Sequence, residues 1–382
     1  MAIKAPIELV VAAFERQDYK AAAQLLKEWL PQFPDNPWLQ LYSAKLQEVS
    51  GKLEAAEAAY RKLLQVTTNA KIALQARQGL QQLEATQKEQ RQAAIAEAEA
   101  DPSNAGLGFL ILEPVKPEAK QAAIQQFARI MKLDPYTARI HLSHRSWKVY
   151  RTGPLAELQV YGQELLNAGL PVFWAPLSEV QKIRVFRVQH IQSASPQATV
   201  VCLNEADQLG ALTFDWAEVS SRVEGTLPIF EDVIDVGAWN KLQRKEQTQD
   251  YAQVFDLHLP KRKCILRFCD ASYQFQQGMI FDATQADGTR LTQTTNRLRW
   301  NNLAKFVGDR LSDVPTASDF TLFAETALEH FTFIRGFKSH MDIFRKRSTA
   351  WDPAFHLYSS LVFLQAPTVN SGLRDRGSET EN

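Results

Sequence analysis

The amino-acid sequence predicts an α+β protein made of several domains, and three observations carry that prediction. The chain has 382 residues, more than the roughly 100–200 that one ordinary domain contains. Its first hundred residues hold only two glycines, Gly51 and Gly79, and are dense in Ala, Leu, Gln, Glu and Lys, which favour helices. From residue 101 onward, short β-rich runs first alternate with helical patterns and then dominate.

Changes in composition divide the chain further. The run ADPSNAGLG (100–108) is rich in residues that break helices, and polar residues dominate from Thr368 onward. We therefore predict a helical domain over 1–104, an α+β domain over 105–195, a β-rich module with C-terminal helices over 196–366, and a disordered tail over 367–382.

Overall composition argues against several classes of protein. The 43 basic and 43 acidic side chains cancel, so no global field attracts nucleic acid or an anionic membrane. No apolar run reaches the roughly 18 residues of a membrane span, and Glu8 interrupts the apolar stretch that an export signal would need. Three cysteines are too few for a disulfide scaffold. We expect a cytoplasmic protein.

The helical domain contains an internal repeat. Aligning DYKAAAQLLKEWL with KLEAAEAAYRKLL pairs positions that are 34 residues apart. In this alignment Gln17 falls over Gly51, at the tight turn before the second helix. The matched core positions are Ala22 with Ala56, Leu26 with Tyr60, and Trp29 with Leu63. Small alanines let two antiparallel helices approach closely, and the large side chains fill the seam between them.

This pattern resembles the tetratricopeptide repeat (TPR) family. Pro34 lies where a TPR unit ends, although Thr68 replaces the second terminal proline and the Trp and Leu-Gly of the family's first helix are missing. The resemblance covers residues 3–68, and a third helix over 69–100 would cap the stack with a polar outer face. Two plain helical hairpins are the alternative. The chain as a whole loosely resembles cyanobacterial TPR proteins of unassigned function.

The resemblance also implies a binding site for a protein partner. TPR arrays bind extended peptides or helices in a concave groove formed by the first helix of each repeat. The family's groove positions fall on Lys4, Ile7 and Glu48, and on the five residues that we select as the candidate site: Val11, Phe14, Trp38, Leu41 and Lys45. Lys45 would meet a carboxylate of the partner. For each residue the alternative role is packing against a neighbouring helix.

The segment over 105–195 reads as alternating strands and helices. Apolar runs at 108–115, 146–151 and 172–175 predict strands, and helical stripes separate them. Strand–helix–strand units with short links predict a parallel pair with a right-handed crossover. With a further strand over 183–188, the segment resembles a ferredoxin-like α+β sandwich.

The remaining segment is predicted to be β-rich and then helical. The runs TVVCLN, GALTFDW, YAQVFDLHL and KCILRFCD predict strands, and LPKRK (259–263) predicts a hairpin tip. Apolar residues from Phe320 to Ile334 recur at helical spacing. The run WDPAFHLYSSLVFL (351–364) predicts a packed aromatic segment.

No motif in the chain carries recognisable chemistry. Loops of the forms GxxxxGK[ST] and GxGxxG, the zinc motif HExxH, paired CxxC and the GxSxG elbow are all missing. Three weaker pairs are better explained without chemistry: His141 and His144 as an exposed helix end, Glu231 and Asp232 as a solvated turn, and Cys264 and Cys269 as buried thiols on opposite faces of one strand. We therefore predict no catalytic, cofactor-binding or metal-binding residues.

The favoured function is a non-enzymatic adaptor, scaffold or assembly factor that binds a protein partner through the TPR groove. Two alternatives stay open. One is a small-ligand-sensing α+β region whose state is relayed to the TPR domain. The other is an RNA-binding protein whose sheet face carries Trp147, Tyr150, Phe173 and Phe186, although the zero net charge argues against nucleic acid. Basic clusters at 261–263 and 345–347 would contact phosphate in that case, and are solvated otherwise. Partner identity, pathway and oligomeric state do not follow from the sequence.

Overall fold

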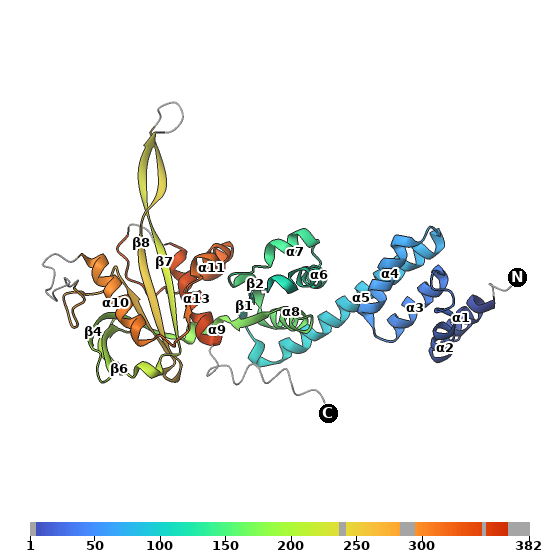
Figure 1. Cartoon of the computed structure of the whole chain (residues 1–382), viewed down its shortest axis with the longest axis horizontal. Coiled ribbons are helices and arrows are strands. Elements are labelled where there is room, and N and C mark those ends of the chain that lie inside the picture. Colours follow the sequence, from blue (N-terminus) through green and yellow to red (C-terminus); the bar gives the residue numbers. More distant parts are fainter. Residues whose placement is uncertain (1–4, 237–241, 283–294, 346–348, 366–382) are drawn as a thin grey trace. The chain divides into compact units, whose positions relative to one another are not determined.

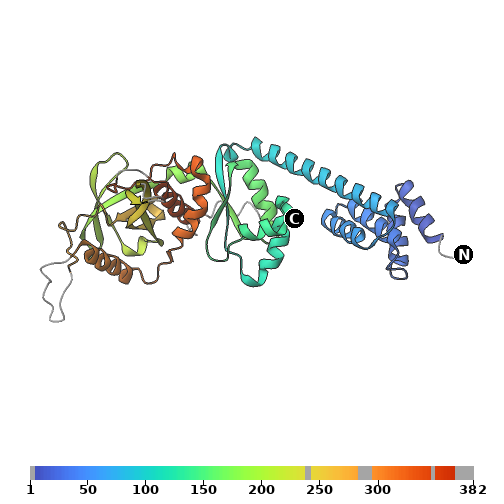
Figure 2. The same ribbon diagram turned by 90° about the horizontal axis from the view of Figure 1, so that it is seen from above.

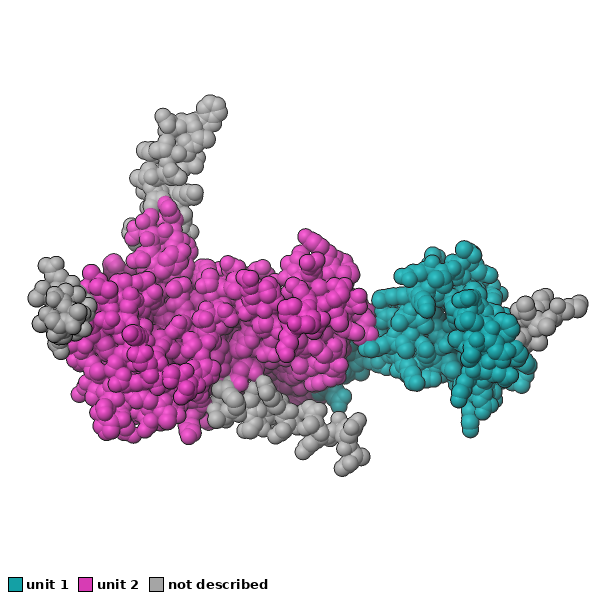
Figure 3. Space-filling view, in the orientation of Figure 1, with its two compact units in different colours: residues 1–97 teal, residues 98–382 magenta. Residues whose placement is uncertain are grey.

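The chain divides into two compact units. The structure is a computed structural model, and it describes residues 5–236, 242–282, 295–345 and 349–365. Unit 1 comprises Met1–Glu97 and unit 2 comprises Ala98–Asn382 (Figure 3). The boundary between them lies close to the predicted end of the helical domain. The predicted tail over 367–382 lies outside the described residues.

Unit 1 is made of helices in its described part. They are α1 (Ala5–Glu15), α2 (Tyr19–Trp29), α3 (Pro37–Val49), α4 (Leu53–Val66) and α5 (Ala70–Ala100). Local capping fixes where they begin, because the Asp18 side chain accepts the Ala21 N–H and the Asn36 side chain accepts the Trp38 N–H. The third predicted helix is confirmed as α5, which continues without a break (Figure 2).

The 34-residue repeat is visible in the burial pattern. Ala22 and Ala56 are both fully buried, and Tyr60 is buried at the position equivalent to Leu26. The turn positions also match: Gln17 has φ +58° and Gly51 has φ +74°. Both residues therefore adopt the left-handed conformation that favours glycine. The predicted helical repeat is confirmed.

Unit 2 begins with a small sheet. Its strands are β1 (Leu107–Leu112), β2 (Lys148–Pro154) and β3 (Val172–Pro176), in the order β2-β1-β3. Between and after these strands run α6 (Lys120–Met131), α7 (Pro135–His141), α8 (Leu155–Asn167) and α9 (Leu177–Lys182). The mixed strand and helix region is as predicted.

The pairing within the small sheet corrects the predicted topology. The strand β1 lies between β2 and β3 and is antiparallel to both, so no parallel neighbouring pair forms. The next strand, β4 (Arg184–Ser193), joins a different sheet. The segment therefore lacks the fourth strand of a ferredoxin-like sandwich, because β4 is held by a partner strand much later in the chain.

That second sheet is the larger one, with the order β10-β7-β8-β9-β4-β5-β6. Its remaining strands are β5 (Ala198–Leu203), β6 (Leu209–Phe214), β7 (Ser221–Val236), β8 (Leu242–Leu259), β9 (Cys264–Cys269) and β10 (Thr316–Ala317). The strands β7 and β8 continue past the others as a two-stranded ribbon (Figure 1). Glu231 and Asp232 lie within β7, so the predicted turn at that point is wrong. The hairpin tip between β8 and β9 is confirmed.

Helices of the C-terminal part cover the large sheet. They are α10 (Asn296–Arg310), α11 (Phe320–Ala327), α12 (Phe331–Ile334) and α13 (Trp351–Gln365). The single helix predicted from Phe320 to Ile334 is interrupted by a 3₁₀ turn over Leu328–His330. Near this point the Thr326 hydroxyl donates to the Phe323 carbonyl and accepts the Val149 N–H, and such bonds compete with the regular helical pattern.

The helix α13 joins the two sheets of unit 2 into one core. On β1, Phe109 and Ile111 pack in the same cluster as α11 and α13, whereas Leu110 and Leu112 face a cluster with α6 and α8. The same α11–α13 cluster includes Val223 of β7 and Val254 of β8. Because α13 is buried on nearly all sides, it is a core helix. The α+β class is confirmed, and the boundary predicted at 195 falls inside this unit.

No helix within the described ranges is both long enough and apolar enough to cross a membrane.

Candidate functional site

The first helices of the repeats are linked by a chain of side-chain contacts. The Phe14 ring of α1 lies 5.0 Å from the Tyr42 ring of α3, centre to centre. The Lys45 Nζ atom lies 5.2 Å from the centre of the same Tyr42 ring. It also donates to the Gln75 Oε1 atom of α5 at 3.3 Å. Phe14 and Lys45 therefore belong to one surface that crosses α1, α3 and α5.

Trp38 lies near the beginning of α3, at a junction between two apolar clusters. It is partly buried and packs against the cluster around Val10 and Leu39 as well as the cluster around Leu41 and Tyr60. The Lys71 Nζ atom of α5 lies 5.8 Å from the centre of the Trp38 ring. A cation over an aromatic ring is an attractive contact, so α5 supplies a second lysine next to this surface.

Lys45 is a partly buried cation without an ion pair to any residue in the described ranges. Its side chain contacts a neutral amide and an aromatic ring rather than a carboxylate. Partial burial lowers the pKa of Lys45, and the negative charge of Glu48 opposes that shift. A carboxylate brought by a partner would neutralise this charge.

Two other predicted groove residues are placed differently. Val11 is partly buried and packs against the cluster around Val10 and Leu26. Leu41 has 0% of its surface exposed and packs with Ala44 and Tyr60. Leu41 is therefore a core residue, and its selection as a contact residue is corrected. The reason is that residues of α4 and α5 both pack in the cluster that contains Leu41. Lys4 lies outside the described residues.

The contact between α4 and α5 explains an otherwise costly glycine. A Cβ atom at Gly79 would lie 2.5 Å from the Tyr60 ring, closer than any side chain tolerates. Tyr60 also donates to the Glu48 Oε2 atom at 2.6 Å. Glycine inside a helix is unfavourable, so Gly79 reflects the close approach of α5 to Tyr60.

Comparison with known families agrees with this geometry. A tetratricopeptide repeat family model matches residues 13–80. The N-terminal region is a TPR region. The match begins within α1, covers α2 to α4 and ends within α5, so the TPR region includes the beginning of the long helix. No curated protein and no solved structure matches the chain. The looser resemblance to cyanobacterial proteins therefore has no support.

The four aromatic residues proposed for RNA do not form an open stacking face. Trp147 and Phe173 pack edge to face at 4.9 Å and adjoin the α11–α13 cluster. Tyr150 packs against Phe127 on the other side of the small sheet, and Phe186 belongs to the large sheet. The predicted sheet face is wrong because these residues serve three different parts of the core.

One arginine of each basic cluster is engaged within the protein, whereas Lys261 and Lys263 are exposed. Arg262 donates to both Glu218 carboxylate oxygens at 2.6 Å and to the Thr213 carbonyl oxygen at 2.7 Å. The nearly buried Arg345 pairs with Asp352. Lys346 and Arg347 lie outside the described residues. Arg262 and Arg345 are therefore not available as free phosphate ligands.

The cysteines behave as predicted. Cys264 and Cys269 are both buried, and they belong to apolar clusters on opposite faces of β9. Burial raises the pKa of Cys264 to about 11 and that of Cys269 to about 12, so neither is a reactive thiolate. Across the described residues, no group of three or more His, Cys, Asp and Glu could hold a metal ion.

A buried polar network in unit 2 was not predicted. Arg267 of β9 makes a two-fold contact with Asp256 of β8, with Nε–Oδ1 at 2.9 Å and Nη2–Oδ2 at 2.7 Å. Ser359 of α13 donates to Asp256 Oδ2 at 2.5 Å. The ring of His258 bridges Ser359, at 2.9 Å from Nε2, and Ser221, at 2.8 Å from Nδ1. The network ties α13 to β7, β8 and β9.

This geometry fixes the protonation of His258. Because Ser359 donates its proton to Asp256, its oxygen accepts the His258 Nε2–H. The Nδ1 atom is then free to accept the Ser221 hydroxyl proton. Burial lowers the pKa of His258 to about 4, so the ring is neutral at pH 7. The sequence signal for this network was the spacing Asp-x-His inside VFDLHL, which places both polar residues on one face of a strand.

Proposed function

We propose that the protein is a non-enzymatic adaptor or assembly factor that captures a protein partner on the inner surface of its TPR region. The observation that carries the proposal is the surface formed by Phe14, Tyr42, Lys45 and Gln75, with Trp38 and Lys71 at its side. Large aromatic residues supply buried contact area in such interfaces. The two lysines favour a partner segment that carries carboxylates.

The proposal does not depend on residues that hold the repeats together. Leu41 and Ala56 are fully buried, so their replacement would disturb binding only through the fold. Trp38 and Lys45 are partly exposed, so their replacement tests contact with a partner directly. The small-ligand and RNA alternatives receive no support from the family match, which concerns residues 13–80 alone.

Immobilised full-length protein and its variants provide the test, with captured proteins identified by mass spectrometry. Trp38→Ala is expected to lose partners at a cost above about 2 kcal/mol of binding free energy, because truncated aromatic anchors commonly cost that much. The matched control is Trp29→Ala, which removes another partly buried tryptophan of the same apolar cluster, at the end of α2, where its ring stacks on Phe33. Equal loss from both variants, or no loss from Trp38→Ala in a folded protein, would contradict the proposal.

A second pair of variants tests the charge. Lys45→Glu is expected to weaken capture, and the difference from the unmodified protein should shrink as salt concentration rises. The control is Lys62→Glu, which makes the same charge change at an exposed position of α4. If both variants capture the partner equally well, binding does not depend on the charge at Lys45.

A further inference from the structure

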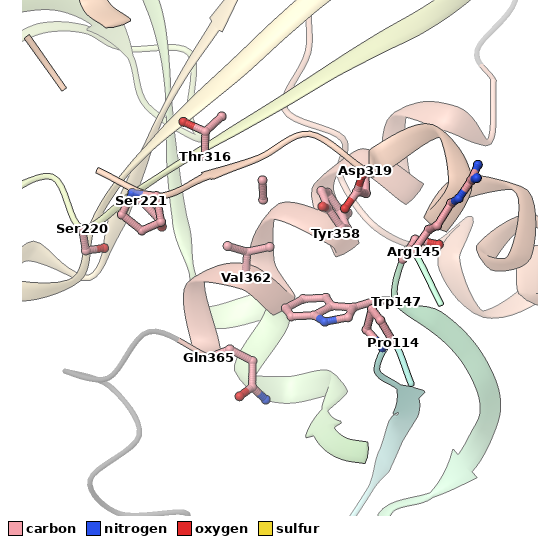
Figure 4. A pocket seen from close by; sticks show the side chains of 13 residues that line it. Pro114, Arg145, Trp147, Ser220, Ser221, Thr316, Asp319, Tyr358, Val362 and Gln365 are labelled. Atoms are coloured by element: carbon pink, nitrogen blue, oxygen red, sulfur yellow. The ribbon is translucent and has the colours of Figure 1, made fainter. Parts of the chain in front are cut away.

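Unit 2 contains a cavity that is separate from the TPR surface. Its volume is about 430 Å³, within the roughly 300–1,000 Å³ typical of small-molecule sites. Five parts of the chain line it: Pro114 after β1, residues 145–147 before β2, Ser220 and Ser221 at the beginning of β7, the segment 315–319, and α13 (Figure 4). Trp147, Tyr358 and Val362 are among its apolar lining residues.

The walls of the cavity are held in place by contacts within the protein. The Trp147 ring packs edge to face against Phe173 at 4.9 Å and against Tyr358 at 6.1 Å. Ser221, at another wall, is fixed by its hydrogen bond to the buried His258. A ligand would therefore meet a preformed surface and would not have to order it, which favours binding.

The lining contains one carboxylate and one guanidinium. The Arg145 side chain extends away from the other labelled side chains in Figure 4, and its Nε atom bonds to the His144 ring at 3.1 Å. Asp319 forms no ion pair with any residue of the described ranges. Burial, and next the negative charge of Asp319, raise the pKa of Tyr358, so this carboxylate lies close to an aromatic wall.

A hydroxyl of the lining is also unused. The Ser220 Oγ atom is buried and has no hydrogen-bond partner among the described residues. Buried polar groups are nearly always paired. A ligand with a polar group on this side would complete the hydrogen bonding of Ser220.

We propose that this cavity binds a small organic cation, namely an amine carried on an apolar body. A carboxylate next to aromatic rings is the combination that attracts an ammonium group, because the carboxylate accepts its N–H bonds and the rings attract its charge. Asp319 supplies the countercharge, Trp147 and Tyr358 supply the rings, and Val362 packs against the apolar body. The site goes beyond partner binding by the TPR region and does not depend on it.

Calorimetric titration of the full chain with three probes of similar size tests the proposal. Phenethylamine carries the ammonium group, phenethyl alcohol is its neutral counterpart, and 3-phenylpropionate carries the opposite charge. The amine is expected to bind with a dissociation constant of about 1 mM or tighter, as a ligand of about nine non-hydrogen atoms can. The alcohol should bind at least about tenfold more weakly, since it lacks the charged hydrogen bonds. No saturable binding of the amine, or stronger binding of the alcohol or the carboxylate, overturns the proposal.

Two variants locate the binding. Asp319→Asn should weaken amine binding at least about tenfold, whereas Asp313→Asn, at an exposed aspartate outside the cavity, should leave it unchanged. Val362→Trp should abolish binding by filling the space, with the melting temperature reported for every variant as a check on folding. If both aspartate variants bind the amine like the unmodified chain, the assignment to this cavity is wrong.

Discussion

Unit 1 contains none of the chain's seven histidines, whereas in unit 2 burial lowers the pKa of six of them. In unit 1 the buried seams are mostly Ala, Leu and aromatic residues, and partners such as Tyr60 and Glu48 are 12 positions apart. In unit 2 the centre is a charged network that joins residues as distant as His258 and Ser359, 101 positions apart. Unit 1 is held by repeated local packing, whereas unit 2 combines apolar clusters with buried polar contacts between distant segments.

The largest expected difference between the units is their response to acid, which should lower the free energy of unfolding of unit 2 more than that of unit 1. The pKa of His258 is lowered to about 4 in the folded state, and an unfolded histidine titrates near 6.5. Between these values the unfolded chain binds more protons than the folded one, so the free energy of unfolding falls as pH falls from about 6.5 to about 4. His258 alone would remove about 3 kcal/mol over that window, and above pH 6.5 it should have no effect.

Amide hydrogen exchange of the full chain measures this difference. Peptides from α13 should lose protection between pH 7 and pH 5, after correction for the intrinsic pH dependence of exchange, while peptides from α4 should not. His258→Gln should reduce the pH dependence of α13, whatever its effect on stability at pH 7. Equal loss of protection in α4 and α13 would mean that the buried histidines do not make unit 2 more sensitive to acid than unit 1.

The packing of unit 1 is tested by two neighbouring alanines of α4. Ala56 is 0% exposed and lies in the repeat seam, whereas Ala55 is exposed. Ala56→Leu should therefore lower the free energy of unfolding of unit 1 by about 1–3 kcal/mol, and Ala55→Leu should change it little. Unfolding in urea, monitored by amide exchange in α4, measures the effects of both substitutions. Equal effects would show that the seam does not run through Ala56.

The smallest expected effect concerns the repeated turn. Gln17 has φ +58° and the equivalent Gly51 has φ +74°, and a left-handed conformation costs a residue with a Cβ atom about 1–2 kcal/mol. Gln17→Gly should therefore raise the free energy of unfolding by about 0.5–1 kcal/mol, after subtracting the greater freedom of glycine in the unfolded chain. The reverse change, Gly51→Gln, should lower it. A loss of stability in Gln17→Gly would show that the side chain of Gln17 is needed at this turn.

Sequence patterns were sufficient to predict the structure where it depends on contacts between residues close in sequence. The 34-residue offset predicted the buried alanines and the turn at Gln17, because each repeat packs mainly on the next one. The second half of β8 (251–259) and β9 followed from composition and alternation. Two polar residues of β8, Asp256 and His258, are visible in the same alternation. They were interpreted only as part of a strand and not as members of a buried polar network.

Pairings between distant segments could not be predicted in the same way. The strand β4 pairs with β9 rather than with the small sheet, and nothing within β4 itself specifies that choice. Leu41 was selected for the groove from its repeat position, but its exposure depends on how closely α4 and α5 pack around it. The cavity likewise exists only because α13 returns between the two sheets.

The late position of α13 in the chain has a consequence for synthesis. Ribosomes add roughly 5–20 residues per second, so Ser359 is made about 5–20 s after His258, its partner 101 positions earlier. During that interval the Asp256–Arg267 pair and the apolar faces of both sheets lack the helix that covers them. Unit 1, whose contacts are local, can fold long before this point. We therefore expect nascent chains halted before α13 to bind chaperones through unit 2 and to be released once α13 has been made.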